Sequence, residues 1–140
     1  MENHKSGFGF QSLEIYRLAK ELVVSCYAIT RNLPAEEKYA LCQQMNRAAV
    51  SIPSNIAEGY SRFSTKEKIH FMNMAYGSLM ELTCQYEIAR DLNYINQEQL
   101  NEYIDKAKNL AVKISNFRKA IEKQWESNRE AVGKRSGNNR

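Results

Sequence analysis

The sequence has few of the residues that interrupt helices or build strands. Its 140 residues include two prolines and six glycines, and threonine and valine are also scarce. Interior prolines and glycines weaken helices, whereas β-branched residues favour strands. Their scarcity therefore indicates an all-α fold, and the length is that of one domain.

Cysteine is scarce as well. Cys26, Cys42 and Cys84 are an odd number with no Cys-x-x-Cys spacing, which argues against a disulfide framework and against a zinc site. Each cysteine falls inside a helical pattern. We therefore expect free thiols that are buried or half-buried.

Long apolar runs are missing. The longest aliphatic run is Leu22-Val23-Val24, far below the roughly 18 residues that a membrane span needs. The first eleven residues, MENHKSGFGFQ, contain no apolar signal region. We expect no membrane partner and a cytoplasmic location.

Histidine occurs only twice, at His4 and His70. A di-metal carboxylate site in a helical bundle needs two Glu-x-x-His pairs and two further glutamates, and the sequence holds one such pair, Glu67 and His70. Neither histidine has an evident partner through which it would activate a nucleophile. We expect no metal, no cofactor and no enzymatic activity.

Apolar side chains at helical spacing are what the sequence has in quantity. They form four amphipathic segments with short connections, which predicts an up-down-up-down four-helix bundle over residues 12–126. A flexible N-terminus, residues 1–11, should precede it, and a basic, disordered tail, residues 127–140, should follow. The predicted helices begin at Ser12 as N-cap, near Ala35, at Ser64 and at Asn96 as N-cap.

The third and fourth segments carry the clearest helix signals. Ser64 with Glu67, and Asn96 with Gln99, have the spacing of capping boxes. A nearly perfect heptad stripe follows the first of these boxes. Its members are Ile69, Met72, Ala75, Leu79, Leu82, Tyr86 and Ala89.

The third segment is also apolar outside its stripe, at Phe71, Met74, Met80 and Ile88. A helix with more than one apolar face has to bury each of them, so we expect subunits to associate there. Gly77, inside the same helix, costs about 1 kcal/mol relative to alanine. A close approach by another backbone would explain it.

Residues 48–62, AAVSIPSNIAEGYSR, combine a helical apolar register with a proline. The register continues through Pro53, which predicts one kinked helix that runs from about Ala35 to Glu58. Ser51 or Ser54 is placed to bond the backbone groups that the proline frees. Gly59 is predicted to be a left-handed C-terminal cap.

The polar residues of this stretch allow two interpretations. Asn55 and Glu58 lie one helical turn apart and are predicted to bond Arg47 or Arg62, which would fix the helix geometry. The alternative is a ligand site, and we favour the structural interpretation. The residues of this structural signature are Ser51, Pro53, Asn55, Glu58 and Gly59.

The nine residues SIPSNIAEG, 51–59, followed by Tyr60 and Arg62, resemble the signature of the family encoded by intervening sequences of bacterial 23S rRNA genes. The stretches 41–49 and 75–81 agree, and the resemblance covers residues 10–123. It implies a four-helix bundle that assembles into a ring, a homopentamer, and associates with RNA. It also implies a distant relation to retroelement accessory variability proteins, and it supplies no catalytic residues.

The net charge of +4 hides an asymmetry. Residues 1–105 carry 10 basic and 13 acidic groups, a net −3, and residues 106–140 carry 10 basic and 3 acidic groups, a net +7. Such a split suggests a polyanion partner, but a solubilising tail or ordinary solvated helix faces would produce it equally well. The candidate RNA-binding residues are Arg47, Arg62, Lys66, Lys68, Lys108, Lys113, Arg118, Lys119, Lys123, Arg129, Lys134 and Arg135.

Two functions follow from these observations. The first is a non-enzymatic, ring-forming bundle that binds structured RNA, such as ribosomal RNA, through phosphate contacts. The alternative is a protein-interaction scaffold or accessory subunit for an RNA-processing or reverse-transcribing partner. The charge asymmetry favours the first, and the excess apolar surface of the third helix is compatible with both.

Overall fold

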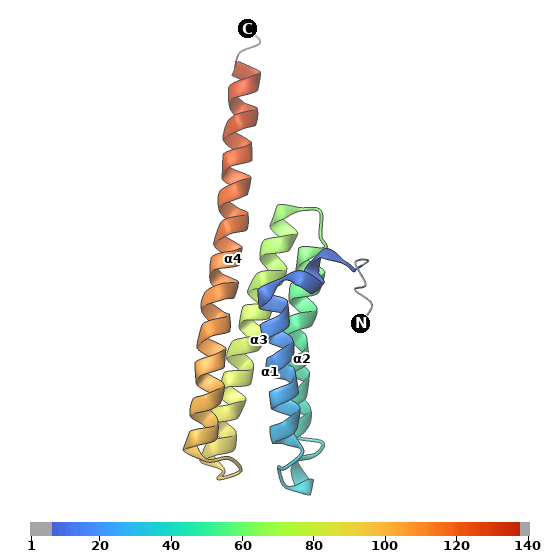
Figure 1. Ribbon diagram of the computed structural model, residues 1–140, viewed down its shortest axis with the longest axis vertical. Coiled ribbons are helices and arrows are strands. Elements are labelled where there is room, and N and C mark those ends of the chain that lie inside the picture. The colour runs from blue at the N-terminus through green and yellow to red at the C-terminus, as the bar shows by residue number, and fades with distance from the viewer. Residues whose placement is uncertain (1–6, 138–140) are drawn as a thin grey trace, which may run out of the picture.

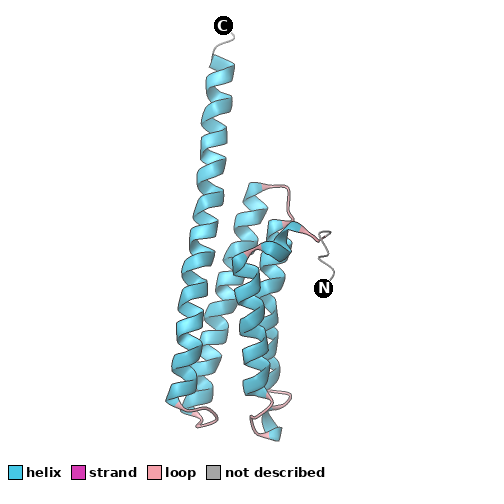
Figure 2. Cartoon of the chain, in the orientation of Figure 1, coloured by secondary structure: helices cyan, strands magenta, loops and turns pink. Residues whose placement is uncertain are grey.

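The computed structural model describes residues 7–137, apart from the side chain of Ser136, and is an all-α four-helix bundle (Figure 1). No strand occurs within that range (Figure 2). The helices are α1 Glu14–Thr30, α2 Leu41–Tyr60, α3 Thr65–Asp91 and α4 Gln97–Gly137, with short 3-10 turns η1 Gly9–Ser12 and η2 Ala35–Glu37.

The chain goes down α1, up α2, down α3 and up α4, as the short connections predict. Each helix packs on two others. α2 and α4 each contact both α1 and α3, so α2 and α4 lie diagonally across the bundle. Within residues 7–137, none of the helices combines the length and the apolar character that crossing a bilayer requires.

The core lies along the predicted stripes. In α3, six of the seven stripe residues, from Met72 to Ala89, are buried, and Ile69 is half-buried. The rings of Tyr86 and Tyr103 stack between α3 and α4, with centroids 3.7 Å apart and an interplanar angle of 6°. Buried residues end at Ile114 on α4, and Phe117 and Ile121 are still partly buried against the core. The last turns of the helix project past the packed bundle (Figure 1).

Both predicted capping residues of the later helices are confirmed. Ser64 Oγ accepts from the Glu67 amide at 3.3 Å. Asn96 and Gln99 exchange two bonds, at 2.9 and 2.8 Å. The prediction for Ser12 is wrong, because its hydroxyl donates to the Gly9 carbonyl inside η1 and Leu13 takes the N-cap position.

The end of α3 has a cap that the sequence did not reveal. Asn93 has a φ of 62°, in the left-handed region. The Tyr94 amide donates to the Ala89 carbonyl, and the Asn93 amide donates to the Arg90 carbonyl, each at 2.8 Å. This is the Schellman pattern, with asparagine in the place where glycine is commoner.

The second helix begins later than predicted. α2 starts at Leu41 and not near Ala35, because the backbone of Ala40, at φ −119° and ψ −104°, departs from helical geometry. Glu37 fixes the new start, since its carboxylate accepts from the Leu41 amide at 3.2 Å and from the Tyr94 hydroxyl at 2.9 Å. α2 is then continuous to Tyr60 with Pro53 inside it, and the kink itself stays a prediction.

The two ends of the chain differ from the expected flexible segments where they are described. Phe10, in η1, packs edge-on against Tyr16 at 5.1 Å. α4 continues as helix to Gly137, where disorder is predicted from Ser127. The reason is local, since good helix formers recur there and the Arg129 guanidinium lies 4.8 Å from the Trp125 ring one turn away. Residues 1–6 and 138–140 lie outside the described range.

The buried core predicts a loss of stability at alkaline pH. Burial raises the pKa of Cys26 from 9.0 to about 11, and burial also raises the pKa of Tyr86 and of Tyr103. These groups therefore ionise more readily in the unfolded state than in the folded state. Their contribution to the free energy of unfolding is complete below pH 9 and is lost as the pH rises. For Cys26 alone the loss is about 1 kcal/mol by pH 10.

Urea unfolding followed by circular dichroism at pH 7.5 and pH 10 measures this effect. The midpoint should fall at the higher pH, and Cys26→Ala should reduce the fall. A midpoint that stays the same at both pH values would contradict the prediction.

Candidate nucleic-acid interface

The signature residues join α2 to α3. The hydroxyls of Ser51 and Ser78 lie 2.8 Å apart across the two helices. Asn55, which is buried, donates to the carbonyl and the hydroxyl of Ser51 at 2.8 and 2.9 Å. Ser54 donates to the Val50 carbonyl at 2.8 Å, next to the Ala49 carbonyl that the proline leaves without its amide partner. Asn55 thus bonds Ser51 and not the predicted arginines.

Gly59 has a different role from the predicted one. It lies inside α2, and no described glycine has a positive φ, so the left-handed cap is wrong. A Cβ on Gly59 would come within 2.6 Å of Phe71 Cβ and 3.0 Å of Met72 Cε. The glycine is therefore required because α2 and α3 approach closely here. Glu58 and Arg62 form the predicted ion pair, at 2.6 Å.

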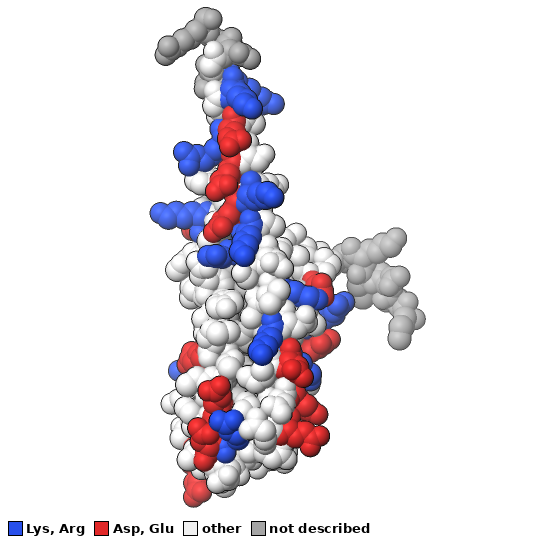
Figure 3. All heavy atoms as spheres, turned by 90° about the vertical axis from the view of Figure 1, so that its left-hand side faces the viewer, with Lys and Arg blue, Asp and Glu red and all other residues white. Residues whose placement is uncertain are grey.

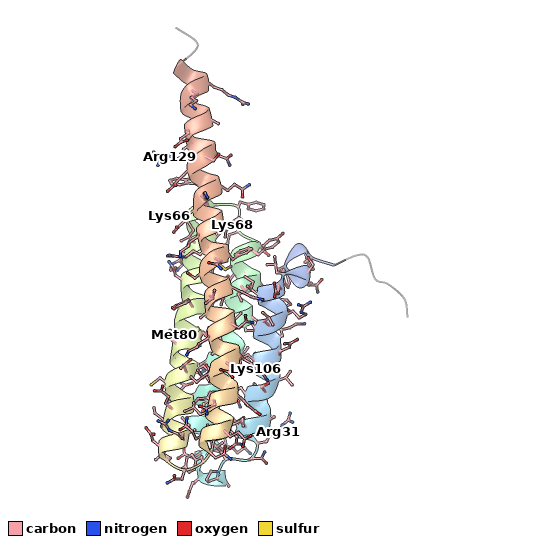
Figure 4. All side chains as sticks on the ribbon, turned by 60° about the vertical axis from the view of Figure 1, so that its left-hand side comes forward. Arg31, Lys66, Lys68, Met80, Lys106 and Arg129 are labelled. Atoms are coloured by element: carbon pink, nitrogen blue, oxygen red, sulfur yellow. The ribbon has the colours of Figure 1, made fainter. Side chains whose placement is uncertain are left out.

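Eight of the twelve candidate RNA-binding side chains lie at one end of the molecule. α4 runs antiparallel to α3, so its last turns pass the start of α3 and project beyond it (Figures 1 and 4). We call this set the basic end. It comprises Arg62, Lys66, Lys68, Lys119, Lys123, Arg129, Lys134 and Arg135.

Most of these cations are available to a ligand. Within the described part of the chain, Arg62 is the only member of the basic end that forms an ion pair. Residues 118–137 of α4 carry six basic and three acidic side chains, a net +3. The acids recur every fourth residue and form one line along the helix, with basic side chains on both sides of it (Figure 3).

The other four candidates are either paired with other side chains or lie in other parts of the bundle. Lys113 pairs with Glu14 of α1, and this hydrogen bond lowers the pKa of the glutamate. Arg118 donates to Asn73 Oδ1 at 3.2 Å and lies 3.9 Å from Glu122. Arg47 and Lys108 are exposed in other parts of the bundle. Sequence spacing could not separate these groups, because the helix pairing decides which of them are neighbours.

The structure also brings together cations outside the predicted set. Arg31 and Lys38 line a groove of about 820 Å³ between α1 and the start of α2, and Arg47 lines it too. None of its lining residues is acidic. Sequence reasoning missed Arg31 and Lys38 because they lie on separate elements with no shared motif.

The Glu67–His70 pair is at the surface. The His70 side chain is exposed and its ring lies edge-on to Phe71 at 5.7 Å. Among the described residues there is no group of three or more His, Cys, Asp and Glu side chains that could hold a metal ion.

The three thiols are free, as expected, but not equally buried. Cys26 and Cys42 are buried, whereas Cys84 is exposed on α3, so the predicted burial is wrong for Cys84. Cys84 lies outside the α3 stripe, on the side of the helix that the bundle does not cover.

This difference predicts selective labelling. In the native protein an aromatic disulfide reagent at pH 8 should modify one thiol quickly, and Cys84→Ser should remove that fast phase. Urea should then expose the remaining two thiols. Two fast thiols in the native wild-type protein would contradict the assignment.

Comparison with known proteins places this geometry in a family. The family model for the 23S rRNA-intervening sequence protein matches residues 11–116. The chain belongs to this family. No curated protein matches it.

One solved structure similar to this member of the 23S rRNA-intervening sequence protein family is a crystal structure from Bacteroides thetaiotaomicron. That protein is described as having unknown function and as coming from the S23 ribosomal protein family. The two share 22% identity with a TM-score of 0.70, over 75% of this chain and 98% of the other. The likeness shows that the bundle fold is shared. The family match ends at residue 116, so the projecting part of α4 lies beyond it.

Proposed function

We propose that this protein is a non-enzymatic, ring-forming bundle that binds structured RNA, such as ribosomal RNA, through phosphate contacts. The observation that carries the proposal is the basic end, where eight cationic side chains from α4 and from the α2–α3 region lie at the same end of the molecule. Phosphate recognition needs lysine and arginine on one surface and no catalytic geometry.

The projecting helix suits such a partner. At 1.5 Å per residue, the 41 residues of α4 span about 60 Å, about 20 Å more than the 27 residues of α3. Arg129, Lys134 and Arg135 therefore lie on the part of α4 that extends beyond the bundle. A ring would repeat this element once per subunit and raise the avidity for a long polyanion.

Exposed apolar faces support the ring. On α3, Met74, Met80 and Ile88 are each 41–43% exposed. Tyr39, just before α2, is 81% exposed, and Val24, on α1, is 71% exposed. Two different apolar faces on one subunit suit a head-to-tail contact, which closes into a ring when the rotation allows it. We propose a homopentamer in the cytoplasm, and light scattering at micromolar concentration tests it, since a monomer would contradict it.

Fluorescence anisotropy of a labelled ribosomal-RNA hairpin across a salt series tests RNA binding. Binding should be tight and salt-sensitive, with a log-log slope of roughly −0.7 to −0.9 per phosphate neutralised. A chain that ends at Glu126 keeps every buried residue but loses Arg129, Lys134 and Arg135, and it should bind more weakly with a shallower slope.

A matched pair of variants locates the site. Lys119→Gln with Lys123→Gln removes two cations of the basic end, and Lys106→Gln with Lys108→Gln removes two from the other half of the same helix (Figure 4). The first pair should weaken binding and the second should not. No binding of the wild-type protein at low salt would contradict the proposal.

The second candidate is a scaffold or accessory subunit for an RNA-processing or reverse-transcribing protein. The exposed apolar face of α3 favours it, because a partner helix would cover the same residues as a neighbouring subunit. A pull-down with and without RNase separates the two functions. A protein partner that is retained after RNase would favour the scaffold.

A further inference from the structure

A groove of about 450 Å³ lies within the basic end, between α4 and the region where α2 ends and α3 begins. Tyr60 and Lys68 line one side, and Ile121, Gln124, Trp125 and Asn128 line the α4 side. Its volume is in the range of small-molecule sites. The α4 wall lies beyond residue 116, so this groove combines the family fold with the projecting helix.

The lining of this groove combines aromatic, amide and cationic side chains. It holds three aromatic rings (Tyr60, Phe117 and Trp125), two amide side chains and a lysine, and no aspartate or glutamate. Within the described residues, neither Gln124 nor Asn128 makes a side-chain hydrogen bond with another residue, and Trp125 is 44% exposed. The amides and the exposed part of the Trp125 ring are therefore open to a ligand.

The cations beside the rings are held in place. Lys68 Nζ donates to the Tyr60 carbonyl at 2.8 Å and lies 5.6 Å from the centre of the Tyr60 ring. An ammonium group has three donors, so two remain for a ligand. The Arg129 guanidinium lies 4.8 Å from the Trp125 ring. Gly9 also lies close to the Tyr60 ring, since a Cβ on Gly9 would come within 2.9 Å of it.

We infer that this groove binds an unpaired nucleotide of an RNA strand. The base stacks on the exposed ring of Trp125, with Tyr60 on the facing wall, and Gln124 and Asn128 bond to the base edge. Lys68 and Arg129 meet the flanking phosphates. The absence of acids in the lining favours an anionic ligand, and the aromatic rings favour a base over an aliphatic side chain. The inference rests on the proposed RNA binding and adds a single-stranded subsite to it.

Trp125 is the only tryptophan, so the tryptophan fluorescence of the full chain comes from this groove alone. Titration with oligouridylate of twelve nucleotides should quench the tryptophan fluorescence. Inorganic polyphosphate of similar charge should bind the basic end without quenching, because it has no base to stack. A blunt twelve-base-pair RNA duplex should behave like polyphosphate.

Variants are compared by anisotropy of labelled RNA. Trp125→Leu should weaken oligouridylate binding about ten-fold, which corresponds to about 1.4 kcal/mol and lies within the range for one stacked base. It should leave the affinity for the duplex and the salt slope unchanged. Trp125→Phe keeps a ring and should restore most of the affinity. Trp125 lies beyond the buried core, so the bundle should fold in each variant.

The outcomes separate the two proposals. Equal oligouridylate affinity for Trp125→Leu and the wild type, with duplex and polyphosphate still bound, would overturn the stacking subsite and leave the RNA function intact. Failure of all three polyanions to bind would overturn both. Quenching by a polyglutamate peptide as strong as that by oligouridylate would overturn the choice of a nucleotide in favour of an acidic peptide.

Discussion

Replacing Leu79 by aspartate should unfold the bundle. Leu79 is fully buried in the α3 seam. Truncating a buried leucine to alanine already costs about 2–5 kcal/mol, and aspartate adds an unpaired buried charge. A domain of this kind has only about 5–15 kcal/mol of stability. Circular dichroism should therefore show a large loss of helix or a much lower melting temperature.

Met80→Asp is the matched control. It makes a similar change one residue later, where the side chain is 41% exposed on the outer face of α3 (Figure 4). The helix content should stay close to that of the wild type, and light scattering should detect a smaller assembly if this face joins subunits. A Leu79→Asp protein with an unchanged melting temperature would contradict the assigned seam.

Gly59→Ala should destabilise the protein by about 1–3 kcal/mol, because it overpacks the α2–α3 contact. The new methyl would come within 2.6 Å of Phe71 Cβ, which is fixed to the backbone of α3 and cannot swing away. The intrinsic preference of helices for alanine, about 1 kcal/mol, opposes this cost but does not cancel it. Urea unfolding gives the difference directly.

Gly77→Ala also replaces a glycine inside a helix, but we expect it to increase the free energy of unfolding. Within residues 7–137, a Cβ on Gly77 would meet nothing within 4 Å, so the close approach that the sequence predicts there is not made by the described part of the chain. The variant should gain about 1 kcal/mol in a monomeric unfolding measurement. If Gly77 instead lies against a neighbouring subunit, light scattering should show a weakened assembly. Equal effects of the two alanines on stability would contradict the assigned α2–α3 contact.

Local features of the chain were predictable because they depend on neighbours in sequence. The α3 stripe, the Ser64 cap and the Asn96–Gln99 box each involve residues three to seven positions apart. The errors have different causes. The Asn93 turn has no glycine to reveal it, and the glutamate that fixes the start of α2 acts across the bundle on Tyr94.

The sequence by itself determined an all-α bundle, its seam and its basic C-terminal third, because helical periodicity and net charge are sums over local positions. Only the tertiary structure decided that Gly59 serves a close helix contact, that Cys84 is exposed and that eight cations share one end. It also placed Tyr60 beside Trp125, 65 positions later. Which residues become neighbours depends on which helices pack together and on how far α4 extends past α3. Local sequence patterns do not contain this information.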